Sequence, residues 1–211
     1  MEQGNKVTLY LDVDDTVLKS SEAVIEILNN KYNITPRKTI NDMHDWEYKS
    51  IYKFVTCDEV VDIYESDEFF SMVKFDEAFI KFYKKHHNKF NFVFVTKGTQ
   101  TNLEKKENLI RKVIGDNFEF IGVPFRYDID GNRVPDYKKA QISMKYGIQV
   151  DDRVDALEKT GANIKILINH GRIRQWNKHY SNINNLYVVM DWNEIAQIAL
   201  FAYENHFIFK K

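Results

Sequence analysis

The sequence predicts an α/β fold, in which a parallel β-sheet is covered by helices on both faces. Short runs of β-branched and aromatic residues alternate with longer helix-like stretches, as such a fold requires. One region without strand-like runs interrupts this alternation. The chain has 211 residues, which is about 60 more than the roughly 150 of a single typical domain. An insertion in that region accounts for the surplus.

Six short runs have the composition of buried strands, and each ends at glycine or a polar residue. They cover residues 7–11, 92–95, 118–121, 147–150, 164–168 and 186–190. Helix-like stretches lie between or after them, for example at 100–113, 137–146 and 192–203. The pattern is typical of a Rossmann-like three-layer arrangement around a parallel sheet.

The interrupting region, between Val17 and Phe90, contains helical patterns and no convincing strand. The patterns cover residues 21–32, 51–54 continuing toward 57–65, 67–72 and 75–87. Ser20 or Ser21 is the candidate N-cap of the first helix. No Gly/Ser-rich linker is present, so this helical unit should pack against the sheet domain. We expect a catalytic core of residues 1–18 and 81–211 and a small helical cap of residues 19–80.

Composition excludes several classes of protein. Hydrophobic residues make up 44% of the chain and charged residues 29%, so a folded core is expected. The formal net charge of -1 offers no broad basic surface, and we expect neither a stable nucleic-acid complex nor membrane binding. The single cysteine, Cys57, excludes an intramolecular disulfide and fits a reducing compartment. Without a spanning apolar run or a signal-peptide pattern, a cytoplasmic protein is expected.

Acidic residues gather at the carboxyl ends of the predicted strands, where open α/β sheets bind their ligands. The first strand is followed by Asp12, Asp14 and Asp15, and the fourth by Asp151 and Asp152. Crowded carboxylates repel one another unless a cation neutralises them, and an all-oxygen set of ligands selects a hard ion such as Mg²⁺. Such an ion commonly completes its shell with water and substrate phosphate, which points to phosphate chemistry.

A single acidic turn is weak support for a catalytic site, because solvated acids are common at strand ends. The order of the residues is more specific. Asp-x-Asp-x-Thr follows the first strand, a Thr closes the second, a Lys lies near a helix start and Asp-Asp closes a later strand. Together these residues form a constellation suited to phosphoryl transfer. Asp15 should alternate to the opposite face from Asp12 and Asp14, Asp155 should cap or salt-link the next helix, and the six histidines show no metal-ligand spacing.

These motifs resemble those of the haloacid dehalogenase superfamily of aspartate-nucleophile phosphohydrolases. The resemblance implies a core of that type and a phosphoric monoester hydrolase. By this resemblance Asp12 is the nucleophile that forms an aspartyl-phosphate, and Asp14 protonates the leaving oxygen and later activates water. Asp12, Asp14, Asp151 and Asp152 are implied as the Mg²⁺ site.

The resemblance also implies groups that bind the transferring phosphoryl. Thr96 would donate to its oxygens together with the backbone N–H of Lys97. The third motif maps onto Asp136-Tyr137-Lys138-Lys139, where we favour Lys139 over Lys138 as the charge-neutralising lysine. The side chain of Lys97 has an equal claim to be a solvated loop residue.

The cap is implied as the substrate-selecting part, and it is rich in aromatic residues. Residues 41–83 hold 11 aromatics in 43 positions, against 14% for the whole chain. Most must form the cap core. Residues 63–70 and 150–155 resemble segments of the 5'(3')-deoxyribonucleotidases, or C-type 5'-nucleotidases. This implies a deoxyribonucleoside monophosphate substrate, with Phe69 and Phe70 as the first base-side candidates and Trp46 next. Lys97 departs from the small residue of that family.

Several alternatives stay open. The enzyme could act on another small phosphate ester or on nucleic-acid ends, and a non-catalytic binding protein of the same fold is a less favoured reading. The sequence leaves open the base and sugar preference, the 5' or 3' position of the phosphate, and which of Asp151 and Asp152 contacts the metal directly. It also leaves open whether the protein forms a homodimer.

Overall fold

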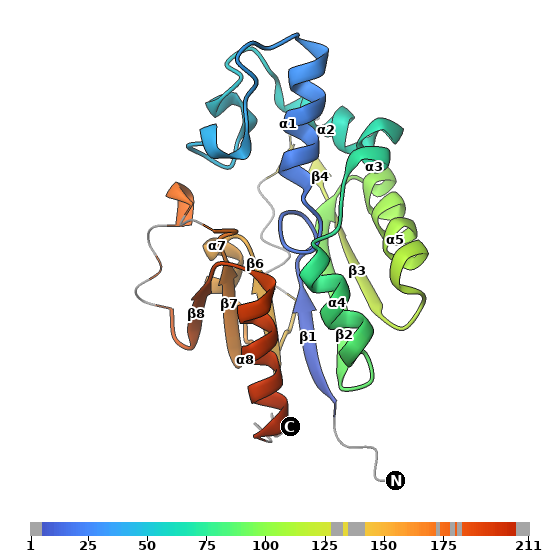
Figure 1. Ribbon diagram of the computed structural model, residues 1–211, viewed down its shortest axis with the longest axis vertical. Helices are drawn as coiled ribbons and strands as arrows, with labels where there is room; N and C mark the ends of the chain where they lie inside the picture. The colour runs from blue at the N-terminus through green and yellow to red at the C-terminus, as the bar shows by residue number, and fades with distance from the viewer. Residues whose placement is uncertain are drawn as a thin grey trace.

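The structure, a computed structural model, describes residues 6–127, 133–134, 142–171, 174–177, 180 and 183–205. Its main feature is a six-stranded sheet, in the order β3-β2-β1-β6-β7-β8 with every neighbouring pair parallel (Figure 1). The strands are β1 (Val7–Leu11), β2 (Phe90–Gly98), β3 (Glu119–Pro124), β6 (Gly147–Asp151), β7 (Ile164–Ile168) and β8 (Leu186–Val189). Each corresponds to one of the six predicted strands.

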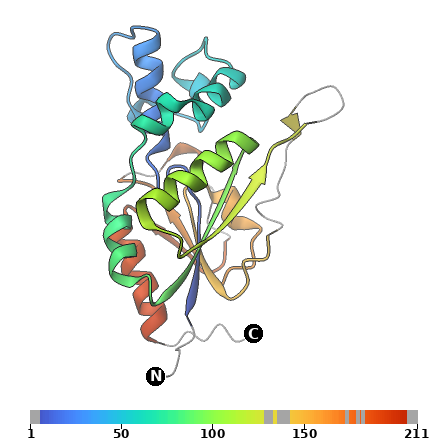
Figure 2. The same cartoon turned by 90° about the vertical axis from the view of Figure 1, so that its right-hand side faces the viewer.

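Helices cover the sheet on both faces, which confirms the predicted three-layer α/β fold. On one face α4 (Glu77–His86) lies between α5 (Gln100–Ile114) and α8 (Trp192–Glu204) (Figures 1 and 2). On the other face α7 (Val154–Glu158) packs against β6 and β7. The central strands β6 and β7 are buried at every position, as expected for strands with helices on both sides.

The inserted helical cap lies beyond the carboxyl ends of the strands (Figure 1). It contains α1 (Ser20–Lys31), α2 (Cys57–Glu65), α3 (Asp67–Met72) and the short 3-10 helices η1 (Ile40–Asp42) and η2 (Tyr48–Ser50). Its two connections to the core run side by side. The N–H of Lys19 donates to the carbonyl of Lys74 at 2.8 Å, and that of Asp76 to Val17 at 2.8 Å. The predicted boundary at residue 80 falls within α4.

Three local expectations differ from the structure. Residues 142–146 form a bend and a turn instead of the predicted helix, whose other residues, 137–141, lie outside the described ranges. The N-cap of α1 is Lys19, without a side-chain cap hydrogen bond, and not Ser20 or Ser21. The short antiparallel pair β4 (Arg126–Tyr127) and β5 (Arg133–Val134) was not anticipated. Within the described ranges, no helix combines the length and apolar character that a membrane span requires.

An aromatic cluster fixes α4 and α8 against the sheet and reaches the loop after β1. Phe79 of α4 is fully buried between Trp192 of α8, at 4.9 Å between ring centroids, and Phe94 of β2, at 6.1 Å. Burial of one such side chain contributes about 1.5–3 kcal/mol. The indole Nε1 of Trp192 donates to the carbonyl oxygen of Thr16 at 2.6 Å. The core therefore holds in place the loop that carries the first group of acids.

Candidate active site

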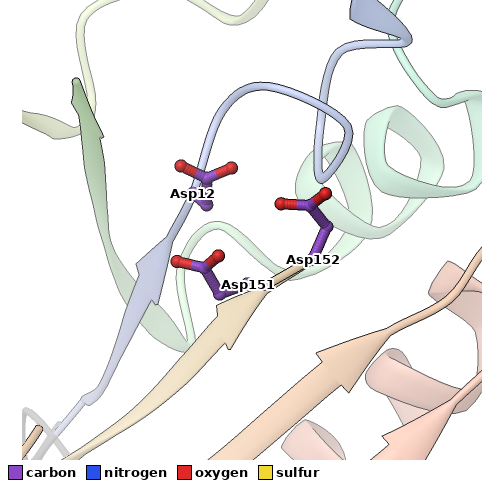
Figure 3. A group of neighbouring side chains, drawn as sticks. All are labelled: Asp12, Asp151 and Asp152. Atoms are coloured by element: carbon purple, nitrogen blue, oxygen red, sulfur yellow. The ribbon is translucent and has the colours of Figure 1, made fainter. Parts of the chain in front are cut away.

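Three carboxylates meet where β1 and β6 end. These strands are neighbours in the sheet, so Asp12 comes next to Asp151 and Asp152. One oxygen from each carboxylate lies within 4.8 Å of those of the other two (Figure 3). The N–H of Asp12 donates to the carbonyl of Val150 at 2.9 Å, which continues the strand pairing into the site.

This carboxylate cluster has the chemistry of a site for a hard cation. Asp12 and Asp151 are buried, where like charges repel strongly unless a cation offsets them. All the available donors are carboxylate oxygens, which suit Mg²⁺ better than a soft metal ion. The residues present therefore fit the predicted Mg²⁺ ion.

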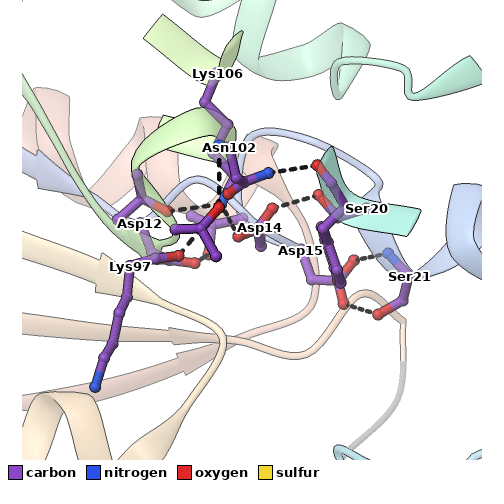
Figure 4. Close-up of polar contacts among 12 residues, drawn as sticks. Asp12, Asp14, Asp15, Ser20, Ser21, Lys97, Asn102 and Lys106 are labelled. Atoms are coloured by element: carbon purple, nitrogen blue, oxygen red, sulfur yellow. Dashed lines mark hydrogen bonds and ion pairs between the residues drawn. The ribbon is translucent and has the colours of Figure 1, made fainter. Parts of the chain in front are cut away.

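Asp14 does not share this cluster, contrary to the expectation of four metal-binding side chains. Its carboxylate accepts a hydrogen bond from Ser20 Oγ at 2.7 Å and forms an ion pair with Lys106 (Figure 4). The extended strand ends at Leu11, so the alternation that was to place Asp14 beside Asp12 no longer applies. Asp14 lies beside the cluster, with its own set of partners.

Lys106 is the site residue that the sequence reasoning missed. It lies on α5 with only 1% of its surface exposed, and its Nζ contacts Asp14, Thr96 Oγ1 at 3.2 Å and the carbonyl of Lys97 at 3.4 Å. A signal was present, because Lys106 shares the buried helix face of Leu103 and Ile110, where a lysine is unusual. The predicted lysines, Lys138 and Lys139, lie outside the described residues.

The end of β2 supplies two side chains that point in different directions. Thr96 is fully buried, and its hydroxyl faces Lys106. The side chain of Lys97 extends away from the acids (Figure 4), and its Nζ lies 5.8 Å from the ring centroid of Phe125. The ammonium group of Lys97 is therefore separate from the group formed by Asp14, Thr96 and Lys106.

Ser20 and Ser21 bind acids instead of capping α1. The hydroxyl of Ser20 donates to Asp14, while the N–H of Ser21 donates to Asp15 Oδ1 at 2.8 Å and its hydroxyl to Asp15 Oδ2. Asp15 lies in the left-handed region, with φ 51°, and outside the carboxylate cluster. The first turn of the cap thus holds two acids of the loop after β1.

A cavity of about 770 Å³ lies between these acids and the cap. On the cap side it is lined by Met43, Trp46, Tyr48, Val60 and Tyr64, among others. Tyr48 and Tyr64 share a hydrogen bond of 2.9 Å between their hydroxyls, and Tyr48 donates to Ser21 Oγ at 3.2 Å. Burial, with the nearby charge of Asp15, raises the pKa of Tyr48, and burial also raises that of Tyr64. Both phenols therefore stay neutral hydrogen-bonding groups.

The predicted aromatic contacts are found only in part. Trp46 lines the cavity, is 46% exposed, and has the guanidinium of Arg153 4.8 Å from its ring centroid. Phe69 and Phe70 do not line the cavity. Phe69 is fully buried against Tyr64 and Phe70, so the structure does not bring these phenylalanines to the cavity, where contacts with a base were expected. They belong to the cap core, because a small helical unit needs large apolar side chains to fold.

No protein-family model and no curated protein sequence matches the chain. Solved structures match it at low identity over nearly its whole length. A protein from Clostridium difficile assigned as a phosphatase is 20% identical, with a TM-score of 0.59 over 92% of this chain and 99% of that one. A haloacid dehalogenase family hydrolase from Deinococcus radiodurans R1, with bound phosphate and sodium, is 12% identical, with a TM-score of 0.58 over 95% and 98%. YfnB from Bacillus subtilis, assigned to the same hydrolases and bound to magnesium, is 17% identical, with a TM-score of 0.51 over 92% and 99%. The chain therefore has the fold of the haloacid dehalogenase hydrolases.

Proposed function

We propose that this protein is a Mg²⁺-dependent phosphatase that hydrolyses a nucleoside monophosphate through an aspartyl-phosphate on Asp12. The observation that carries the proposal is the grouping of Asp12 with two further carboxylates, beside Asp14, Thr96 and Lys106 and below a cavity. A nucleophile, a proton-transfer group and phosphate-binding donors are the parts that such a reaction needs. The bound phosphate of the Deinococcus hydrolase supports this assignment.

Each residue has a role that its position allows. The Asp12 carboxylate would attack phosphorus, and Asp14, held by Ser20, would give a proton to the leaving oxygen and then accept one from the attacking water. Thr96 and Lys106 would donate to the phosphoryl oxygens. Asp12, Asp151 and Asp152 would hold Mg²⁺, which would neutralise phosphate charge when bound.

The cap supports a nucleoside as the leaving group. The volume of the cavity, about 770 Å³, lies within the range of about 300–1,000 Å³ that is usual for small-molecule sites. Trp46 offers a half-exposed ring at this cavity, and stacking on a base is worth about 1–3 kcal/mol. Residues 63–70 and 150–155, which resemble the deoxyribonucleotidases, favour a deoxyribonucleotide among the nucleoside monophosphates.

Phosphate release from purified protein tests this proposal. The substrates would be the 5'- and 3'-monophosphates of ribo- and deoxyribonucleosides, with sugar phosphates for comparison, each assayed with Mg²⁺ and with chelator. We expect the highest kcat/KM on a deoxyribonucleoside monophosphate and loss of turnover on metal removal. Asp12→Asn should abolish turnover while the circular dichroism spectrum stays unchanged, because an amide is a poor nucleophile.

The outcomes separate the parts of the proposal. Equal rates on sugar phosphates would remove the nucleotide assignment but leave a phosphatase. Turnover that survives thorough metal removal would contradict the role of Mg²⁺. A near wild-type rate for Asp12→Asn would show that Asp12 is not the nucleophile.

A further inference from the structure

A buried asparagine from a later segment of the chain holds the loop after β6, where Asp152 follows Asp151 at the end of the strand. Asn177 closes the short 3-10 helix η3 (Gln175–Asn177), and its side chain is fully buried. Its Nδ2 donates to the carbonyl of Asp152 at 2.7 Å, and its Oδ1 accepts from the N–H of Val154 at 3.1 Å. One amide therefore binds the backbone on both sides of Arg153.

A second asparagine supports the first. Asn169, fully buried just after β7, accepts with its Oδ1 from Asn177 Nδ2 at 3.4 Å and from the N–H of Arg174 at 3.3 Å. The N–H of Asn177 in turn donates to the carbonyl of Arg174 at 3.0 Å. Asn177 is thus held at its side chain by Asn169 and at its backbone by Arg174, in addition to its contacts with the loop after β6.

The same turn also binds the side chain of the first acid, Asp151. Asp151 Oδ1 accepts from the N–H of Arg153 at 3.0 Å, which links the first acid to the same turn. Asp152 is the first residue after the end of β6. Its carbonyl is oriented by Asn177, and the direction of its side chain depends on that peptide.

We propose that Asn177 is a positioning residue that sets the affinity of the Asp12, Asp151 and Asp152 cluster for Mg²⁺. The proposal rests on the metal site of the proposed function and adds a residue that contacts neither metal nor substrate. Groups that orient metal ligands typically change metal affinity by about 10–100-fold when they are removed. We therefore expect Asn177→Ala to weaken Mg²⁺ binding by about tenfold or more.

The chain offers a matched control for the loss of a buried amide. Asn29 of α1 is buried and binds both backbone groups of Lys38, through Nδ2 to the carbonyl at 2.8 Å and through Oδ1 from the N–H at 3.0 Å. It lies in the cap and is not a member of the carboxylate cluster. Asn29→Ala should destabilise the protein to a similar extent as Asn177→Ala and leave Mg²⁺ binding unchanged.

The experiment is isothermal titration of metal-free full-length protein with Mg²⁺, beside urea unfolding of each variant. Asn177→Ser is included because its hydroxyl can bind one of the two backbone groups, and its loss of affinity should fall between those of wild type and Asn177→Ala. Should the alanine variant fail to fold, the serine variant decides. In phosphatase assays, excess Mg²⁺ should restore kcat, with the substrate KM near its wild-type value.

The three possible negative results have different meanings. If wild type binds Mg²⁺ and the folded Asn177 variants bind it with an affinity within twofold of wild type, this inference is wrong and the proposed function stands. If wild type binds no Mg²⁺, both are wrong. An equal loss of affinity in Asn29→Ala would also overturn the inference, because general destabilisation would then explain the effect.

Discussion

At the scale of single residues, Lys106 is the main addition that the structure makes to the predicted site. Its ammonium group is buried on the apolar face of α5 and lies against Asp14 and Thr96. Burial of a charge is costly unless the charge is paired. A lysine in the same buried helix stripe as Leu103 and Ile110 therefore needs an acidic partner. Sequence reasoning could flag the stripe but not the partner, because Asp14 lies 92 residues earlier.

Replacement of this lysine gives a direct prediction. Lys106→Met keeps the length of the side chain and removes its charge, so a phosphoryl group bound as proposed would lose a donor. We expect kcat to fall by about 10²–10³-fold. Phosphate-release kinetics measure the effect, with Lys112→Met as the control, since Lys112 is exposed on the same helix. Equal activity of the two variants would contradict the role of Lys106.

At the scale of elements, the carboxyl ends of the strands could be predicted from the sequence. The start of helix α1 could not. Apolar runs closed by Asp12 and by Asp151 identified β1 and β6, and parallel strands bring such ends together. Ser20 and Ser21 have the composition of an N-cap, yet tertiary contacts direct them to Asp14 and Asp15. Local patterns could not reveal this, because a serine hydroxyl can serve either purpose.

Helix α4 carries a group that makes the stability of the fold depend on pH. His86 is 9% exposed, and its Nδ1 has no hydrogen-bond partner within the described structure. Burial, followed by the charges of Lys89 and Lys85, lowers the pKa of His86 below its ordinary value of 6.5. The folded state therefore favours neutral His86. The stability that neutral His86 provides is present above the unfolded-state pKa and is lost as pH falls through the lower, folded-state pKa.

Urea unfolding of wild type and His86→Gln at about pH 7, 6 and 5 measures this dependence. We expect the unfolding free energy of wild type to decrease over this range and that of His86→Gln to decrease less, because glutamine does not titrate. His44→Gln, at an exposed histidine, should follow wild type. Identical slopes for all three proteins would contradict the assignment.

At the scale of the whole molecule, the cap is bound to the core at the start of α5. Asn102 Nδ2 donates to the carbonyl of Tyr64 at 2.6 Å, and Lys105 forms an ion pair of 2.6 Å with Asp67. The same helix also bears Lys106, whose ammonium group contacts Asp14.

The sequence predicted the sheet, the inserted cap and the acids, because each is encoded by a local run of residues. It did not predict Lys106 or Asn177, whose roles depend on contacts between distant segments.

The proposed mechanism requires a covalent phosphoryl intermediate on Asp12. The most direct measurement is to quench the enzyme during turnover with Mg²⁺ and substrate, reduce it with borohydride and map the peptides by mass spectrometry. An acyl phosphate on Asp12 would be reduced to homoserine, so we predict homoserine at position 12, and none when substrate is left out. Homoserine at another aspartate, or unmodified Asp12 under conditions where phosphate is being released, would show that Asp12 is not the nucleophile.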